Sequence, residues 1–210
     1  MIRLSHAQLV IVDISGYTDF IVNRTVSLVH AEEVVSELLD ALAERSQHPL
    51  TLNKFEGDAA LLYAESGDDP AAAASDVVAQ LGSMFDAFAD SRESIRLKRV
   101  GCGCDACTNI TNLQLKAFMH CGEIAIKQLR GFTELAGEDV ILLHRLLKND
   151  VEGKEYVLLT GAVCALWPQA DAAGYATTVT CDGVGSIGIR VLSPDRLPRI
   201  SAAAETFTPN

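Results

Sequence analysis

The sequence predicts an α/β (α+β) fold, a ferredoxin-like βαββαβ palm with extra strands toward the C-terminus. Three observations lead to this expectation. Residues 9–13 form a buried strand-like run, residues 50–63 form a strand hairpin, and residues 113–129 contain a further long strand. A helical segment lies on each side of the hairpin, which gives the split order of elements that a palm of this kind requires.

The first strand and the first helix differ in the spacing of their apolar residues. Residues 9–13 are a continuous apolar, β-branched run that ends on a carboxylate, and Gly16 breaks it. Ser27 is the expected N-cap of the long helix that follows, and Pro49 closes that segment. The apolar positions of this helix recur at helical spacing, at Ala31, Val34, Val35, Leu38 and Leu42.

The middle of the chain supplies the hairpin and the second helix. Residues 50–55 and 59–63 are strand-like and are separated by Glu56-Gly57-Asp58, which is typical of a hairpin with glycine in the turn. The sequence Asp68-Asp69-Pro70 then opens a helix, since acids and proline favour the first turn, and we expect it to end near residue 91.

The C-terminal third alternates between strands and one helix. We expect a loop at residues 131–137, a helix at 138–148, a strand at 156–159 and a closing hairpin at 177–192. At about 150 residues per domain, the length favours one domain. We place it at residues 1–195, with a cysteine-rich loop inserted at 100–110 and a flexible tail at 196–210.

Composition narrows the possible partners. The chain has 17 Lys and Arg against 28 Asp and Glu, a net charge of −11, so we expect it to bind neither nucleic acid nor an anionic membrane surface. Its apolar content of 49% is that of a globular protein. Residues 1–6 make a poor signal peptide, and no apolar stretch reaches the ~20 residues of a membrane span. We therefore expect a cytoplasmic protein.

Two carboxylates occupy similar places at strand ends. Asp13 ends the first strand, and Asp58 follows the glycine of the hairpin. In a palm, these strands can be neighbours, and both carboxylates then lie at one edge of the sheet. Such a pair is what two Mg²⁺ or Mn²⁺ ions need in order to hold a triphosphate. The alternative is that Asp13 caps the following turn and Asp58 is an ordinary turn residue.

Four motifs, in order along the chain, resemble those of class III nucleotidyl cyclases. Residues 12–18 (Val-Asp-Ile-Ser-Gly-Tyr-Thr) resemble the first metal motif, and residues 54–58 (Lys-Phe-Glu-Gly-Asp) resemble the second. Residues 120–124 (His-Cys-Gly-Glu-Ile) are similar to the His-x-Gly-Glu strand, and residues 137–145 to the helix of the transition-state residues. The Cys-x-Cys-x-x-Cys insertion and residues 144–149 suggest a little-characterised bacterial branch.

The resemblance implies a function and a set of roles. It implies a cyclase-homology domain that converts ATP to cyclic AMP and pyrophosphate in a head-to-tail homodimer with shared active sites. Asp13 and Asp58, with Ile14, would bind Mg²⁺ or Mn²⁺. The turn after the first strand would offer backbone N–H groups to the phosphates, through Ser15, Gly16, Tyr17 and Thr18.

The resemblance also assigns residues to the base and to the transition state. Lys54 matches the purine-reading lysine, which would act from the partner chain. Glu134 lies where adenylyl cyclases have an aspartate that accepts from the adenine amino group, although glutamate is one methylene longer. Arg145 matches the arginine that stabilises charge on the α-phosphate. The alternative for Arg145 is a solvated helix residue paired with Glu138 or Asp139.

Two departures from the family's pattern leave a second function open. Ile141 stands where the family has a ribose-orienting asparagine, and it cannot form a hydrogen bond. Residues 184–189 contain no lysine for the terminal phosphates, with Arg190 as the available substitute. The alternative is therefore a catalytically degenerate, cyclase-like module that binds a nucleotide or a metal ion and signals through its dimer interface.

Three cysteines lie within six residues, at Cys102, Cys104 and Cys107. Three thiolates and one further ligand make a tetrahedral Zn²⁺ site, and the fourth ligand would be Cys121, His120 or a residue of a partner chain. The alternatives are reduced thiols, a redox sensor, a disulfide within the loop, or an iron–sulfur cluster.

Overall fold

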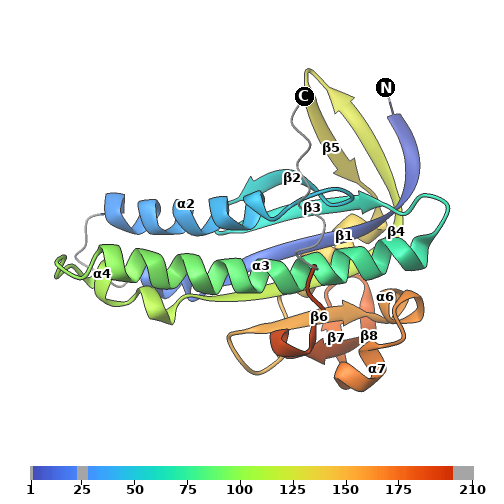
Figure 1. Cartoon of the computed structure of the whole chain (residues 1–210). Helices are drawn as coiled ribbons and strands as arrows, with labels where there is room; N and C mark the ends of the chain where they lie inside the picture. The colour runs from blue at the N-terminus through green and yellow to red at the C-terminus, as the bar shows by residue number, and fades with distance from the viewer. Residues whose placement is uncertain (1, 23–27, 201–210) are drawn as a thin grey trace, which may run out of the picture.

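The structure is a computed structural model, and it describes residues 2–22 and 28–200. Eight strands form one sheet in the order β2-β3-β1-β4-β6-β8-β7, with β5 paired to β4 outside this path (Figure 1). Every pair is antiparallel except β4 with β6. The strands are β1 (Ile2–Ser15), β2 (Thr51–Glu56), β3 (Ala59–Glu65), β4 (Gln114–Leu129), β5 (Phe132–Ala136), β6 (Tyr156–Thr160), β7 (Gly174–Cys181) and β8 (Gly185–Leu192).

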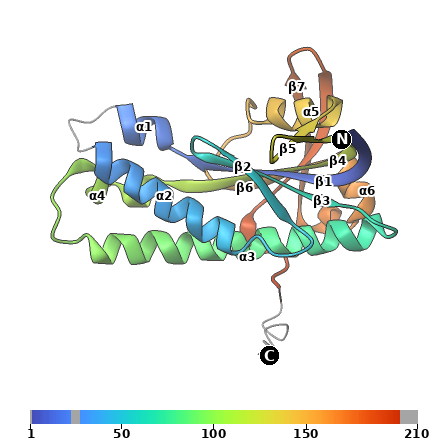
Figure 2. The same ribbon diagram turned by 90° about the horizontal axis from the view of Figure 1, so that it is seen from above.

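Helices cover the two faces of the sheet unequally. The long helices α2 (Leu28–Glu44) and α3 (Pro70–Lys98) run side by side on one face, and α5 (Glu138–Leu146) lies on the other (Figure 2). The order β1-α2-β2-β3-α3-β4 and the strand order β2-β3-β1-β4 confirm the predicted ferredoxin-like palm. The short helices are α1 (Tyr17–Val22), α4 (Asp105–Thr108), α6 (Gly161–Leu166) and α7 (Ala170–Ala173), with 3₁₀ turns η1 (Ile110–Asn112) and η2 (Pro194–Arg196).

The alternation of β1 decides which face receives the carboxylate at its end. Val10, Val12 and Ile14 belong to the apolar core under α2 and α3, whereas Leu9 and Ile11 belong to the core under α5. Because side chains along a strand alternate between faces, Asp13 lies on the α5 face. The long helices thus have no direct part in the site that Asp13 forms.

The predicted helices are confirmed, with different ends. Asp69 caps α3 by accepting the backbone N–H of Ala72 at 3.0 Å, as the sequence indicated. The helix continues to Lys98, beyond the expected end near residue 91, because Ile95 packs into the core. The expected N-cap of α2, Ser27, lies outside the described residues.

The expected loop at 131–137 is wrong. Residues Phe132–Ala136 form β5, which pairs with the end of β4 after a tight turn at Arg130 (φ 49°) and Gly131 (φ 89°). The strand is short and only Leu135 is fully buried in it, so its hydrophobic pattern is weak. Together with the start of β1 it projects from the body of the protein (Figure 1). The sequence also did not predict α6 and α7.

Packing continues past residue 195, where the sequence placed the end of the domain. Leu197 is buried in the core, and Arg199 forms an ion pair with Asp86 of α3 at 2.6 Å. Gly82 makes room for this segment, since a Cβ there would lie 2.0 Å from the carbonyl oxygen of Pro198. This segment therefore packs on α3; residues 201–210 lie outside the described part, and the domain boundaries stay a prediction.

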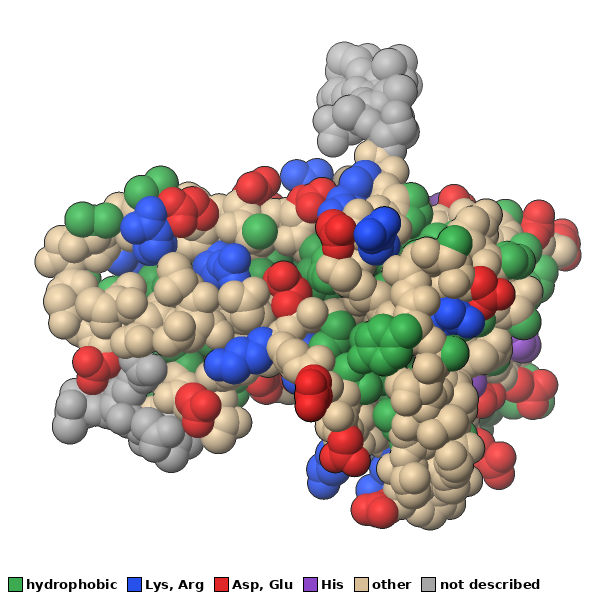
Figure 3. All heavy atoms as spheres, turned by 90° about the horizontal axis from the view of Figure 1, so that it is seen from below, with side chains coloured by type: hydrophobic (Ala, Val, Ile, Leu, Met, Phe, Trp, Pro, Cys, Tyr) green, Lys and Arg blue, Asp and Glu red, His purple; other side chains and the backbone are tan. Residues whose placement is uncertain are grey.

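Two surface properties bear on partners. Among the described residues, no helix is long and apolar enough to cross a membrane. On the face shown in Figure 3, Lys and Arg side chains are scattered among Asp and Glu rather than gathered into a stripe.

Candidate active site

Asp13 and Asp58 lie beside each other at the end of β1. The backbone N–H of Ile14 donates to the carbonyl oxygen of Asp58 at 3.0 Å, and Asp13 pairs in register with Ala59. Burial, and then the charge of Asp58, raise the pKa of Asp13 to about 6, whereas Lys116 lowers it. Burial also raises the pKa of Asp58. The predicted pair is therefore a set of two partly buried carboxylates that interact electrostatically.

Lys116 and Tyr156 border this pair and were not anticipated. Lys116 is directly opposite Asp13 in the β1–β4 register, and its ammonium nitrogen lies 4.9 Å from the centroid of the Tyr156 ring. The Tyr156 hydroxyl donates to Asn149 at 3.0 Å. In the sequence, the one sign of this site was a lysine between apolar residues, Leu115-Lys116-Ala117. A lysine in such a place is equally typical of an ordinary exposed position of a strand.

The turn after β1 is held by contacts within the chain. Gly16 has a φ of 92°, and a Cβ there would lie 3.1 Å from the carbonyl oxygen of Asn112. Its own carbonyl accepts the N–H of Phe20 at 2.9 Å, at the start of the six-residue α1. The Tyr17 hydroxyl donates to Glu32 of α2 at 3.1 Å. The phosphate-binding roles of Ser15, Gly16, Tyr17 and Thr18 remain predictions.

A second charged cluster lies on the α5 face, and it contains both predicted base-reading residues. Lys54 lies 3.1 Å from Glu56 and 3.5 Å from Glu134 of β5. Glu56 also contacts Nε2 of His144 at 3.0 Å, and Nδ1 of His144 donates to the carbonyl oxygen of Val140 at 2.8 Å. Both histidine nitrogens therefore lie beside acceptor oxygens.

In this second cluster, hydrogen-bond donors stabilise the negative charge of Glu56. Burial alone would raise the pKa of Glu56, but hydrogen bonds from Lys54 and His144 outweigh it and hold the pKa below its usual value. The hydrogen bond to Glu56 raises the pKa of Lys54. Asn53 adds a bond to the β5 arm by donating to the carbonyl oxygen of Thr133 at 2.7 Å. The sequence singled out Lys54 and Glu134, but not Glu56 or His144.

Arg145 is exposed on α5 and is not brought to Asp13 or Asp58 of its own chain. It lines a shallow surface groove with Val140, Ile141, His144 and Lys148. The charges that shift the pKa of Asp13 come from Asp58 and Lys116. Ile141 is 54% exposed in the same groove. Arg145 is therefore not among the charges that act on Asp13.

His120 and Asp139 fasten α5 to the sheet. Nε2 of His120 lies 2.8 Å from the Asp139 carboxylate, and Nδ1 lies 2.9 Å from the hydroxyl of Thr160. Asp139 occupies the space above Gly122, where a Cβ would lie 2.0 Å from its carboxylate oxygen. Asp139 is thus committed to His120, and the alternative pairing of Arg145 with Asp139 finds no support.

The three clustered cysteines meet a histidine from α2. His30 Nδ1 lies 3.7 Å from Sγ of Cys102 and 3.6 Å from Sγ of Cys104. One ligand atom from each of these residues and from Cys107 lies within 4.8 Å of all the others. All six cysteines of the chain are free thiols.

The expected fourth partner of the cysteines is therefore wrong. His120 is bonded to Thr160 and Asp139 instead, and Cys121 is buried in β4, where burial raises its pKa to about 11. His30 lies 72 positions before Cys102, so no local spacing could reveal it.

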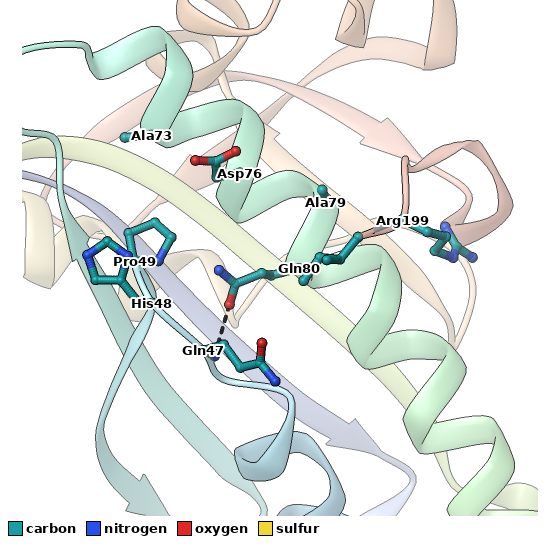
Figure 4. A pocket seen from close by; sticks show the side chains of 9 residues that line it. Gln47, His48, Pro49, Ala73, Asp76, Ala79, Gln80 and Arg199 are labelled. Carbon is teal, nitrogen blue, oxygen red and sulfur yellow. Dashed lines mark hydrogen bonds between the residues drawn. The ribbon is translucent and has the colours of Figure 1, made fainter. Parts of the chain in front are cut away.

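Another cavity lies between the α2–β2 connection and α3 (Figure 4). It is lined by Gln47, His48, Pro49, Asp76 and Arg199, among others. The backbone N–H of Gln47 donates to the buried Gln80 side chain at 3.2 Å, which closes its floor. None of the predicted site residues lines it.

Comparison with known proteins identifies the family. Residues 35–156, more than half of the chain, match the family described as "Protein of unknown function (DUF2652)". The chain belongs to the DUF2652 family. A relative, "Uncharacterized protein Rv2561/Rv2562" of Mycobacterium tuberculosis, is 34% identical to this DUF2652 protein over 153 residues, which cover 72% of this chain and 69% of the relative.

Solved structures show what fold this DUF2652 protein has. The guanylyl cyclase Cya2 superposes with a TM-score of 0.72 at 15% identity, covering 98% of this chain and 96% of that one. The adenylyl cyclase CyaB from P. aeruginosa gives 0.69 at 13%, with 92% and 96% covered. A class III adenylyl cyclase-like ATP-binding protein from Pseudomonas aeruginosa gives 0.64 at 14%, with 79% and 35% covered. The fold is thus that of class III cyclase catalytic domains.

Proposed function

We propose that this chain is a nucleotidyl cyclase of the class III type, from a bacterial branch that carries the cysteine insertion, and that it forms cyclic AMP and pyrophosphate from ATP. The observation that carries the proposal is the pair Asp13 and Asp58. Both are partly buried at one end of the sheet, and burial with mutual repulsion raises the pKa of Asp13 to about 6. A cation that binds between the two carboxylates would relieve their repulsion, so the arrangement favours a metal site.

The residues fit Mg²⁺ or Mn²⁺. Asp13 and Asp58 offer the carboxylate oxygens that these hard cations prefer, and Ile14 offers a backbone carbonyl. Among the described residues, Lys116 is the cation that lowers the pKa of Asp13, and it leaves that pKa well above its usual value. When bound, the metal would neutralise phosphate charge and acidify the ribose hydroxyl. The Lys116 ammonium group would lie beside the bound metal and add a second positive charge.

Lys54 and Glu134 recognise the nucleotide base. Their side chains lie 3.5 Å apart, so they present one donor and one acceptor side by side. Adenine offers the complementary pair, an acceptor at N1 and a donor at its amino group. Glu56 contacts the Lys54 ammonium nitrogen at 3.1 Å and is itself contacted by His144 at 3.0 Å, so this chain of contacts orients Lys54.

The active site is completed by a second copy of the chain. Arg145 is exposed and is not among the charges that act on Asp13, and Lys54 pairs with Glu56 and Glu134. In a head-to-tail homodimer the phosphate-holding carboxylates of one protomer meet Lys54, Glu134 and Arg145 of the other. One triphosphate then touches both chains.

A catalytically degenerate nucleotide-binding module is the second candidate. It is favoured by Ile141, which is 54% exposed where a ribose-orienting asparagine is expected. A solved neighbour of this fold is itself described as a cyclase-like ATP-binding protein. If the first candidate holds, Ile141→Asn should raise turnover about 30- to 1000-fold, since an orienting hydrogen bond supplies ~2–4 kcal/mol. Unchanged turnover in the folded variant favours the module.

The deciding experiment incubates the protein with each nucleoside triphosphate and Mn²⁺ and detects cyclic products by mass spectrometry. We expect cyclic AMP from ATP and a loss of at least about 100-fold in Asp13→Asn. Asp76→Asn, an exposed carboxylate on α3, is the matched control and should retain full activity. Mn²⁺-dependent ATP binding by calorimetry without any cyclic product would establish the module instead.

A further inference from the structure

We propose that Cys102, Cys104, Cys107 and His30 form a structural Zn²⁺ site that ties the first turn of α2 to the connection between α3 and β4. This inference is independent of the proposed cyclase activity. It rests on the convergence of four ligand atoms from two segments that are far apart in the sequence.

The separations match the edges of one tetrahedral ion. With Zn–S bonds of about 2.3 Å and a Zn–N bond of about 2.0 Å, a tetrahedral site places sulfur and nitrogen about 3.5 Å apart. The two Sγ–Nδ1 distances are 3.7 Å for Cys102 and 3.6 Å for Cys104. All four ligand atoms lie within 4.8 Å of one another, which leaves room for a single ion and not for a multinuclear cluster.

Local backbone structure presents the thiols together. Cys104 is the N-cap of α4, and its sulfur accepts the backbone N–H of Cys107 at 3.5 Å. The Cys102 N–H donates to the carbonyl oxygen of Arg99 at 2.9 Å, which fixes the start of the loop. The donors are soft thiolates and one imidazole, the set that selects zinc over magnesium or calcium.

Arg99 balances the charge of such a site. Three thiolates and one Zn²⁺ leave a net charge of −1, and the Arg99 guanidinium hydrogen-bonds with Cys107. The same guanidinium holds Glu33 at 3.1 Å and Glu37 at 2.7 Å, both on α2. The metal site and this ion-pair network therefore join the same two segments, the start of α2 and the end of α3.

The site has a structural role because the segment that carries its cysteines is anchored in the core on one side. Ala106 and Ile110 are fully buried between α2 and α3, and Cys107 is also buried. The residues that follow the first two cysteines pack on both long helices, since α4 contacts α2 and η1 contacts α3. Four protein ligands fill a tetrahedral zinc ion, so no position remains for a substrate.

The test is metal analysis of the full chain, produced without an affinity tag that binds metal and purified without chelator. We expect about one zinc per chain, and binding of Co²⁺ to the metal-depleted reduced protein with a thiolate charge-transfer band and strong d–d absorption. His30→Ala and Cys104→Ser should each lower zinc content at least fivefold. His48→Ala and Cys181→Ser, which alter residues outside the cluster, are the matched controls and should leave it unchanged.

Thermal unfolding gives a second readout that does not depend on variants. Removal of zinc should lower the Tm by about 10 °C, because the metal cross-links two segments of the core. The proposal is overturned if the native reduced protein binds neither zinc nor cobalt, or if a disulfide among the three cysteines appears as a two-proton mass loss. Full zinc occupancy and an unchanged cobalt spectrum in His30→Ala would exclude His30 as a ligand.

Discussion

Two acidic centres share the α5 face of the sheet, and they differ in how their charge is balanced. At Asp13, burial and the neighbouring Asp58 raise the pKa to about 6, and Lys116 offsets only part of this. At Glu56, Lys54 and His144 donate hydrogen bonds, and the pKa lies below its usual value. Burial acts to raise the pKa of both groups; at Asp13 a like charge adds to it, whereas at Glu56 hydrogen-bond donors outweigh it.

Under the proposed function, the difference separates a metal-binding centre from a base-recognition centre. A cation bound at the Asp13–Asp58 pair would relieve the repulsion between the two carboxylates. Glu56 already accepts hydrogen bonds from Lys54 and His144, so it would gain less from a metal ion. Its contact with Lys54 orients that side chain.

Removal of one carboxylate from the pair should have the largest effect. Asp58→Asn should weaken Mn²⁺ binding by at least about 100-fold, because one anionic ligand is lost from a site with few alternatives. Titration calorimetry or electron paramagnetic resonance measures this directly. Glu56→Gln is the matched control and should change the affinity by less than about twofold. Equal losses in both variants would mean that the two centres are not distinct.

The pH dependence of stability should be opposite in sign at the two centres. Because folding raises the pKa of Asp13, its favourable contribution is complete below about pH 4 and is lost as the pH rises through about 6. Asp13→Asn should therefore raise the free energy of unfolding at pH 7.5, by about 1–2 kcal/mol after allowance for partial exposure. Urea denaturation at pH 5 and pH 7.5, without added Mg²⁺ or Mn²⁺, measures both values.

Glu56 supplies the opposite slope in the same experiment. Its pKa is lowered, so its contribution is present above the unfolded pKa and is lost as the pH falls through the folded one. Glu56→Gln should therefore reduce stability at neutral pH and have little effect in acid. A destabilised Asp13→Asn protein at pH 7.5 would contradict the assignment of Asp13 as an uncompensated carboxylate.

Loss of Lys54 from the Glu56 cluster should have the smallest effect on stability. Lys54→Ala should lower the free energy of unfolding by less than about 1 kcal/mol, since both of its ion pairs are partly exposed. Under the proposed function it should lower ATP affinity about tenfold and leave Mn²⁺ affinity unchanged. Calorimetry with ATP and with Mn²⁺ alone separates the two. Lys154→Ala, an exposed lysine before β6, is the matched control for loss of a lysine.

The sequence predicted the palm because its signals are local. Hydrophobic period, the capping acid Asp69 and the turn glycine Gly57 each act over a few residues, and all were readable. The motif around Asp13 and Asp58 likewise places two short segments, and the sheet register brings them together. The first-strand pattern missed only the extension back to Ile2, where exposed residues hide the alternation.

The parts that were missed depend on contacts between distant segments. His30 joins Cys102 across 72 positions, and His144 joins Glu56 across 88. Neither residue has a neighbour in sequence that signals its partner, because the pairing is created by helix placement. The strand β5 was missed for a related reason, since its pairing with β4 and the contact from Asn53 supply what its weak apolar pattern does not.

The bridge between Asp139 and His120 seats the first turn of α5 on the sheet. Asp139 lies over Gly122 and bonds to a buried imidazole. Further along the helix, Leu143 and Leu146 are buried in the core, and His144 contacts Glu56. Both ends of α5 are therefore anchored, so a ligand that meets the exposed Arg145 meets it at a height above the sheet that the helix has already set.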